Sequence, residues 1–147
     1  MIKITKNIND LNFKCNPVIS YNEGYKIGLK LQNTVLFKGI KNITVGLAHN
    51  QIKGNKQVYI THYKNKFRIF INPTIINQSK NFIKHKEGCL SYKKGNTVIR
   101  YNWIVIKHLT ENGYIQEKFE GFEGYIHQHE YDHLQGIDIH HKTIEYL

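Results

Sequence analysis

Five consecutive residues, His129-Glu130-Tyr131-Asp132-His133, have the types and spacing of a metal-binding helix. Two histidines four positions apart lie on one face of a helix, so both imidazoles can bind the same metal ion. Glu130 lies between them and could move protons to and from a metal-bound water. Because so short a pattern also arises by chance on surface helices, the rest of the chain must decide between a metal site and an ordinary helix.

A catalytic site of this kind needs a third protein ligand and one open position. In Glu87-Gly88-Cys89-Leu90-Ser91, a cysteine lies between an extended segment and a strand, where it would present a thiolate at a turn. A ligand downstream of His133 would instead indicate a zincin-like endopeptidase or another metal amidase. The downstream candidates, none on a convincing second helix, are Asp138, His140, His141 and Glu145.

The elements that must position these residues are mostly strands. Apolar residues at near-helical spacing predict one helix over residues 23–37, and a second follows Gly121 and Gly124 and ends near Gly136. We therefore expect an α+β fold, with mostly antiparallel sheets around a central HExxH helix, one N-terminal helix, and residues 1–147 forming a single domain. Strands are predicted at residues 57–62, 67–72, 74–77, 96–100, 103–109 and 114–119.

Composition narrows the class of protein. Of the 147 residues, 40% are hydrophobic, which suits a globular chain. No run approaches a membrane span and no leader is evident, so we expect a cytoplasmic protein without a membrane partner. The two cysteines, Cys15 and Cys89, do not make a disulfide framework, and Cys15 is interpreted as a small packed or incidental residue.

The net charge of +10 could indicate a nucleic-acid partner. Of the 21 basic residues, however, only Arg68 and Arg100 are arginines, and the basic residues are scattered without a block. Proteins that recognise bases or phosphates use arginine forks and clustered charge. We therefore expect weak non-specific attraction to RNA and no specific nucleic-acid recognition.

Three motifs in order resemble the peptide deformylase family. They are Thr44-Val45-Gly46-Leu47-Ala48-His49-Asn50-Gln51, the Glu87–Ser91 segment, and Gln128 through His133. The resemblance covers roughly residues 23–139 and implies a metal-dependent hydrolase that removes the N-formyl group from the initiator formylmethionine of nascent peptides and releases formate.

The resemblance also implies roles for individual residues. Cys89, His129 and His133 would hold one divalent metal, Fe(II) in the cell, with Zn or Ni possible in purified protein. Glu130 would be the general acid and base, and a metal-bound water the nucleophile. Gln51 and the Leu90 N–H would stabilise the oxyanion.

Six further residues are assigned to substrate binding by the same resemblance. They are Val45, Gly46, Leu47, Gly88, Tyr125 and Ile126. Backbone at Val45, Gly46 and Gly88 would pair with an extended peptide, and both glycines are interpreted as close-approach positions. Core packing remains the alternative for the side chains of Val45, Leu47 and Ile126. The remaining histidines are interpreted as surface or packing residues, with His127 pointing away from the metal.

Departures from the family pattern leave a non-enzymatic copy of the fold open as a further hypothesis. Thr44 and His49 replace a glycine and an alanine of the family motif, and Lys93 stands where the family usually has proline. The resemblance is to a short form lacking the family's C-terminal helix, as in phage or organellar members, so only transient ribosome proximity is expected. We expect a monomer, in the host cytoplasm if phage-encoded.

Overall fold

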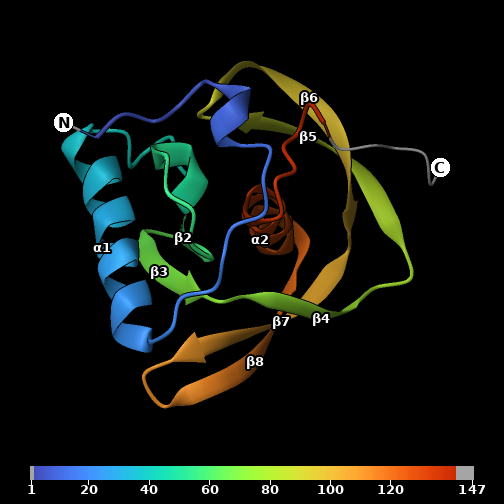
Figure 1. The fold of residues 1–147 in the computed structure, drawn as a ribbon. Coiled ribbons are helices and arrows are strands. Elements are labelled where there is room, and N and C mark those ends of the chain that lie inside the picture. Colours follow the sequence, from blue (N-terminus) through green and yellow to red (C-terminus); the bar gives the residue numbers. More distant parts are fainter. Residues whose placement is uncertain (1, 142–147) are drawn as a thin grey trace.

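The computed structural model describes residues 2–141, which form an α+β fold of two α-helices and three antiparallel sheets (Figure 1). The strand orders are β1-β2-β3, β4-β7-β8 and the hairpin β5-β6. The elements are η1 (Ile8–Asp10), α1 (Tyr21–Phe37), β1 (Gly46–Ala48), η2 (His49–Ile52), β2 (Val58–Tyr63), β3 (Lys66–Ile71), β4 (Thr74–Gln78), β5 (Phe82–Cys89), β6 (Tyr92–Tyr101), β7 (Trp103–Thr110), β8 (Gly113–Glu120) and α2 (Gly121–Leu134).

Helix α1 begins at a side-chain cap and packs closely on the first sheet. The Ser20 hydroxyl accepts a hydrogen bond from the Glu23 backbone N–H at 3.1 Å, which satisfies a free donor of the first turn. Gly24 and Gly28 lie one turn apart on the buried face, and a Cβ at Gly28 would collide with the Ile69 side chain of β3. The two glycines therefore let the helix backbone approach the sheet.

Helix α2 lies among the sheets and is seen nearly end-on in Figure 1. It contacts strands of all three sheets: β1 and β2, β6, and β7 and β8. Its buried residues include Ile126, Glu130 and His133, so the polar motif faces inward. The helix gives the motif a rigid frame, and strands reach it from several directions.

Each predicted helix and strand has a counterpart in the structure, which adds β1 and η2 and begins β6 at Tyr92, four residues before the predicted strand. The segment before α1 contains the 3-10 turn η1, and Gly121 and Gly124 lie in the first turn of α2, not before it. Strand β5 extends over eight residues where only an extended segment preceded Glu87. The turn between β7 and β8 falls between the strands predicted at residues 103–109 and 114–119, with Thr110 paired to Gly113, whose φ is +104°.

Cys15 is buried in the core, and burial raises the pKa of its thiol to about 11.

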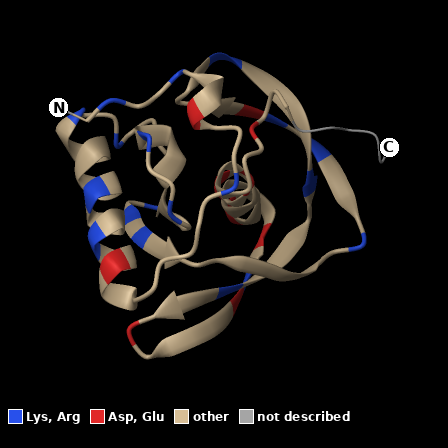
Figure 2. Cartoon of the chain, in the orientation of Figure 1, with Lys and Arg blue, Asp and Glu red and all other residues tan. Residues whose placement is uncertain are grey.

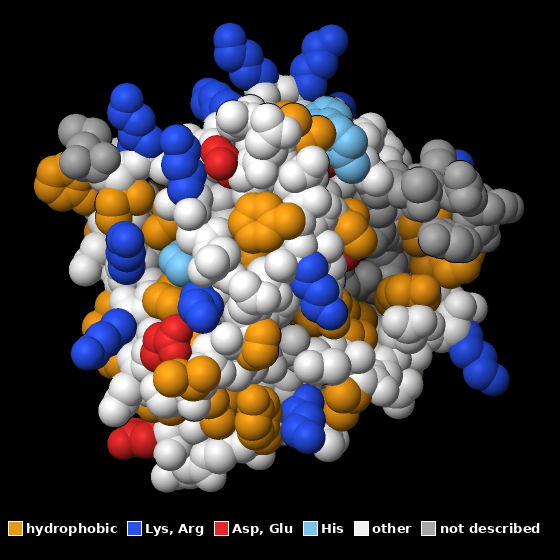
Figure 3. All heavy atoms as spheres, in the orientation of Figure 1, with side chains coloured by type: hydrophobic (Ala, Val, Ile, Leu, Met, Phe, Trp, Pro, Cys, Tyr) orange, Lys and Arg blue, Asp and Glu red, His pale blue; other side chains and the backbone are white. Residues whose placement is uncertain are grey.

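Basic residues are spread over α1, the strands and the loops, whereas α2 contains no lysine or arginine (Figure 2). On the face drawn in Figure 3, lysines project singly between apolar and neutral side chains. In residues 2–141 no helix is both long and apolar enough to cross a membrane. The charge forms no continuous basic stripe on this face, as the scattered sequence pattern predicted.

Candidate metal centre

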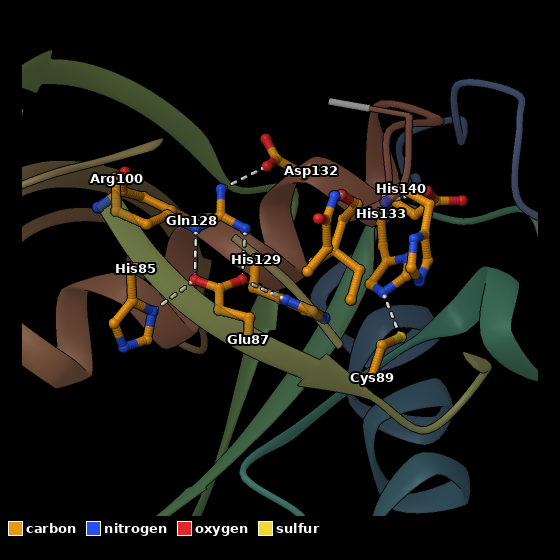
Figure 4. A network of polar contacts seen from close by, with 12 residues as sticks. His85, Glu87, Cys89, Arg100, Gln128, His129, Asp132, His133 and His140 are labelled. Atoms are coloured by element: carbon orange, nitrogen blue, oxygen red, sulfur yellow. Dashed lines mark hydrogen bonds and ion pairs between the residues drawn. The ribbon is translucent and has the colours of Figure 1, made fainter. Parts of the chain in front are cut away.

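Three side chains from distant parts of the chain converge at one end of β5. Cys89 ends that strand, while His129 and His133 lie one turn apart on α2. Their potential ligand atoms all lie within 4.8 Å of one another, and Cys89 Sγ is 3.4 Å from His133 Nε2 (Figure 4). Across residues 2–141 this is the only such group of histidine, cysteine, aspartate and glutamate. It leaves out the downstream candidates Asp138, His140 and His141, and Glu145 lies outside the described residues.

The ring of His129 is oriented by Glu87, two residues before Cys89. His129 Nδ1 donates to Glu87 Oε1 at 2.8 Å, which leaves Nε2 for the centre. Burial opposes charge on His129, but hydrogen bonds to Cys89 and Glu87 outweigh it and raise the pKa of the ring to about 10. The neighbours that favour a positive charge on this ring would also favour a bound cation. For His133, burial lowers the pKa well below 6.5, so this ring is neutral, as a ligand must be.

A buried arginine, Arg100, binds Glu87 on the side away from the metal ligands. Arg100 of β6 is 1% exposed and donates two bonds to Glu87, both at 2.7 Å, and a third to Asp132 Oδ2 at 2.6 Å. Figure 4 shows the guanidinium between these two carboxylates, with His85 on the other side of Glu87. Burial alone would raise the pKa of Glu87, but the bonds from Arg100 and His129 hold it far below its usual value. Glu87 therefore remains an ionised acceptor for His129.

Glu130 lies beside the three ligands in a closely packed setting. It is 2% exposed, and its Oε1 has no hydrogen-bond partner among the described residues. A Cβ at Gly46 of β1 would lie 2.5 Å from Glu130 Oε2, so only glycine allows the strand to approach this carboxylate. Burial raises the pKa of Glu130 to about 7, although the nearby His129 acts in the opposite direction. A carboxyl group with this pKa can both accept and release a proton near neutral pH.

Gln51 reaches the same centre from η2. Its Oε1 accepts the Ala48 backbone N–H at 3.0 Å, which turns the amide nitrogen toward Cys89. That nitrogen lies 3.6 Å from Cys89 Sγ and donates to Ser91 Oγ at 3.2 Å. Gln51 is 2% exposed, so its position is fixed by packing as well as by these bonds.

A cavity of about 390 Å³ opens onto the centre, a size suited to a small ligand or a peptide end. One wall comes from the segment entering β1, the other from β5 and its turn, and the floor from α2. Strand β1 lies at the edge of its sheet, and β5 pairs only with β6 among the described strands. The lining residues are Ile43, Thr44, Val45, Gly46, Gln51, His85, Lys86, Glu87, Gly88, Cys89, Leu90, Phe122, Tyr125, Ile126, His129 and Glu130.

A family model of polypeptide deformylase matches residues 4–145, nearly the whole chain. The chain belongs to the polypeptide deformylase family. The peptide deformylase of Karelsulcia muelleri is 34% identical over 142 residues, which cover 92% of this chain and 66% of that protein. The peptide deformylase of Mycoplasma genitalium is 45% identical over 102 residues, covering 63% of this chain and 53% of that protein. The matches thus span about half the length of the first curated relatives.

Solved deformylases share the fold along almost their whole length. The Met-Ala-Ser-bound class I type b peptide deformylase of Acinetobacter baumannii superimposes with a TM-score of 0.82 at 27% identity, over 95% of this chain and 97% of that chain. The Thermotoga maritima enzyme gives a TM-score of 0.82 at 26% identity, over 97% of each chain. The deformylase resemblance stated from the three motifs is therefore confirmed at the level of family and fold.

Within this deformylase fold, the residues expected to bind substrate lie in two different places. Val45, Gly46, Gly88, Tyr125 and Ile126 line the cavity. The exception is fully buried Leu47, which packs in the core between α1 and the first sheet and does not line the cavity. Successive residues of a strand point to opposite faces, so its position next to Gly46 turns Leu47 away, and packing is the better interpretation.

The two close-approach glycines also differ. Among residues 2–141, no atom beyond the two chain neighbours lies within 4 Å of a Cβ placed at Gly88, so this position is open, whereas Gly46 is restricted by Glu130. The sequence interpretation missed Arg100, which it treated as scattered charge, and it gave no role to Glu87 or His85. The signal for Glu87 was its place in the cysteine motif, but no local pattern marks Arg100 as buried.

His49, a departure from the deformylase motif, gives a pH-dependent stability. Its ring is 9% exposed, and its Nδ1 accepts the Lys56 backbone N–H at 3.0 Å. Burial, then the charges of Lys30 and Lys56, lower the pKa of His49 to about 4 from 6.5. Between these values the unfolded chain binds the extra proton, so His49 stabilises the fold above pH 6.5 and this contribution is lost as the pH falls toward 4.

We expect this loss to appear in urea unfolding measured from pH 7.5 to 4.5. His49→Gln keeps an acceptor for Lys56 but does not titrate, and serves as the matched control. The stability difference between wild type and His49→Gln should be constant above pH 7 and shift toward the variant at lower pH. A difference that stays constant over the whole range would show that His49 does not carry the effect.

Proposed function

We propose that this chain is a metal-dependent peptide deformylase, which hydrolyses the N-formyl group of the initiator formylmethionine of nascent peptides and releases formate. The observation that carries the proposal is the convergence of Cys89, His129 and His133 beside a buried carboxyl group, Glu130. Family membership supports the reaction class. The proposal treats residues 1–147 as one catalytic domain.

Cys89, His129 and His133 would hold the divalent metal. One thiolate and two imidazoles accept Fe(II), Zn or Ni, and we propose Fe(II) in the cell. The bond from His129 to Glu87 is the outer contact that metal-binding histidines commonly make. When bound, the ion would supply Lewis acidity, polarising the formyl carbonyl and acidifying a water.

Glu130 would move the protons of the reaction. Its carboxylate takes a proton from the attacking water and delivers it to the amine that leaves as the formyl C–N bond breaks. Its pKa of about 7, raised by burial, suits both steps. The nearby Gly46 backbone excludes bulk water from one side of the carboxyl group.

The oxyanion that develops on the formyl oxygen needs hydrogen-bond donors. Gln51 and the backbone N–H of Leu90 would supply them. Gln51 is turned toward the centre because its carbonyl oxygen is held by Ala48, so it is oriented before substrate arrives. Each such donor commonly lowers the barrier by about 3 kcal/mol.

The cavity fits an extended peptide end with an apolar side chain. Gly46 of β1, Val45 just before it and Gly88 of β5 line the cavity, where main-chain groups could pair with a peptide. Tyr125 and Ile126, with Val45, would form the apolar wall for the methionine side chain. Phe122 and His85 extend this wall, since the His85 ring packs 4.6 Å from that of Tyr125.

Binding partners beyond the substrate follow from the surface. The scattered lysines of Figure 3 favour transient proximity to the ribosome over specific recognition of nucleic acid. We further propose that the chain acts as a monomer, because the site needs no residue from a second copy.

The test is formate release from a formyl-Met tripeptide by protein purified without oxygen, since ferrous iron and a thiolate ligand are both readily oxidised. We expect formate production, about one metal per chain, and loss of both in Cys89→Ala. A zincin-like metal amidase would keep its metal and activity in Cys89→Ala. Stoichiometric metal without formate from any formylated peptide would contradict the proposal and favour a non-enzymatic copy of the fold.

A further inference from the structure

Cys89 lies near the turn of a hairpin that forms a sheet by itself. Strands β5 and β6 pair only with each other among the described strands, and their ladder shifts register between Glu87 and Cys89. A two-stranded hairpin is marginally stable alone, whereas a metal site tolerates only a few tenths of an ångström in ligand position. The cysteine therefore needs an external support that fixes it opposite the helix carrying both histidines.

Tyr92 provides a direct connection between the two halves of the centre. It is the cross-strand partner of Cys89 in the ladder of β5 and β6. Its hydroxyl donates to Asp138 Oδ2 at 2.5 Å, and Asp138 is 5% exposed. Asp138 belongs to the segment that leaves α2, five residues after His133. A short path of backbone and one hydrogen bond thus joins the cysteine to the helix.

Asp138 is itself held in one orientation. Its Oδ1 accepts the backbone N–H groups of His140 and His141 at 2.9 and 3.0 Å, and His141 Nδ1 at 2.6 Å. These bonds occupy one carboxylate oxygen and leave the other for Tyr92. Because these bonds hold the carboxylate independently of Tyr92, the carboxylate can fix the position of the strand.

Two further hydrogen bonds join the same segments. Asn96 Nδ2 donates to the Ile139 carbonyl at 2.6 Å, and His140 Nε2 lies 2.8 Å from the Lys94 carbonyl. The rings of Tyr92 and His140 meet edge to face at 4.7 Å. The first residues of β6 are thus bonded at several points to the segment that follows α2.

We propose that Tyr92 and Asp138 are positioning residues for the metal centre, which hold Cys89 at the distance from His129 and His133 that a shared ion requires. The inference rests on the proposed function, because it assumes a metal at these three residues. Neither residue lines the cavity or belongs to the group of three potential ligands, so their effect is on ligand geometry. The proposal predicts that substitutions of Tyr92 or Asp138 change metal affinity and thiolate ligation as well as stability.

The test uses the full chain loaded with Co(II), whose thiolate charge-transfer absorption reports ligation by Cys89. Tyr92→Phe keeps the ring contact and removes only the hydroxyl. We expect about tenfold weaker Co(II) retention in competition with a chelator, the lower end of what loss of an outer contact usually causes, and a changed thiolate band. Asp138→Ala should weaken Co(II) retention to the same extent. Asp138→Asn should weaken it less, because asparagine keeps a hydrogen-bond acceptor. The double variant Tyr92→Phe/Asp138→Ala should retain Co(II) no worse than either single variant.

Tyr59→Phe is the matched control, because the Tyr59 hydroxyl also makes a buried hydrogen bond with α2, 2.6 Å from His127 Nδ1, but Tyr59 belongs to β2 and not to the hairpin. It should lower thermal stability without changing the thiolate band or Co(II) retention. If Tyr92→Phe changes only stability, as this control does, the positioning role is wrong. If the wild-type chain shows no thiolate band with Co(II), the proposed function fails as well, which distinguishes the two failures.

Discussion

Glu130→Gln is expected to lower formate release by about 10³-fold while leaving the metal content unchanged. General acid and base groups commonly contribute 10²- to 10⁴-fold, and Glu130 would act in both the attack and the departure steps. Glutamine has nearly the same shape, so the close packing against Gly46 should be kept. The measurement is steady-state formate release at pH 7, with metal per chain determined on the same preparation.

Glu123→Gln is the matched control, since Glu123 lies in the first turn of the same helix and does not line the cavity. Its activity should stay within about twofold of wild type, as for surface substitutions generally. If Glu130→Gln loses metal together with activity, Glu130 supports the ligands and does not only move protons. If it keeps both, the assigned role is wrong.

The sequence could predict the parts of the site that local patterns encode. The spacing of His129 and His133 predicts a helix face, and the glycine–cysteine–leucine motif predicts an accessible turn. The structure places these side chains together, with Gln51 alongside. The order of strands and the late helix were also predictable, because alternating apolar residues and turn residues are local properties.

What the sequence could not predict depends on burial of polar residues. Arg100 has the same appearance in the sequence as any charged residue of a strand, and only the assembled fold shows it enclosed between Glu87 and Asp132. The contact between Tyr92 and Asp138 joins residues 46 positions apart. Leu47 shows the opposite case, in which a motif residue next to the site turns into the core because strand side chains alternate.

Arg100→Met is expected to destabilise the fold by about 3–5 kcal/mol, the largest stability effect we predict. Removing the central cation of a buried ion network is strongly destabilising, because the carboxylates of Glu87 and Asp132, whose side chains are 7% and 12% exposed, lose the guanidinium that lies between them. Methionine fills much of the same volume, so the loss is mainly electrostatic. The measurement is urea unfolding at pH 7, with Arg100→Lys as a second variant that keeps the charge but not the paired bonds.

Arg68→Met is the matched control, because Arg68 also makes a two-bond contact with a glutamate, Glu117, at 3.1 and 2.7 Å. Both side chains there are about one-third exposed, so water and salt screen the pair, and we expect a loss of about 1 kcal/mol or less. Equal losses of unfolding free energy in the two variants would show that burial does not determine how much the Arg100 network stabilises the fold. A large loss in Arg100→Met alone, accompanied by weaker metal retention, would show that the same buried charge both stabilises the fold and keeps Glu87 ionised to orient His129.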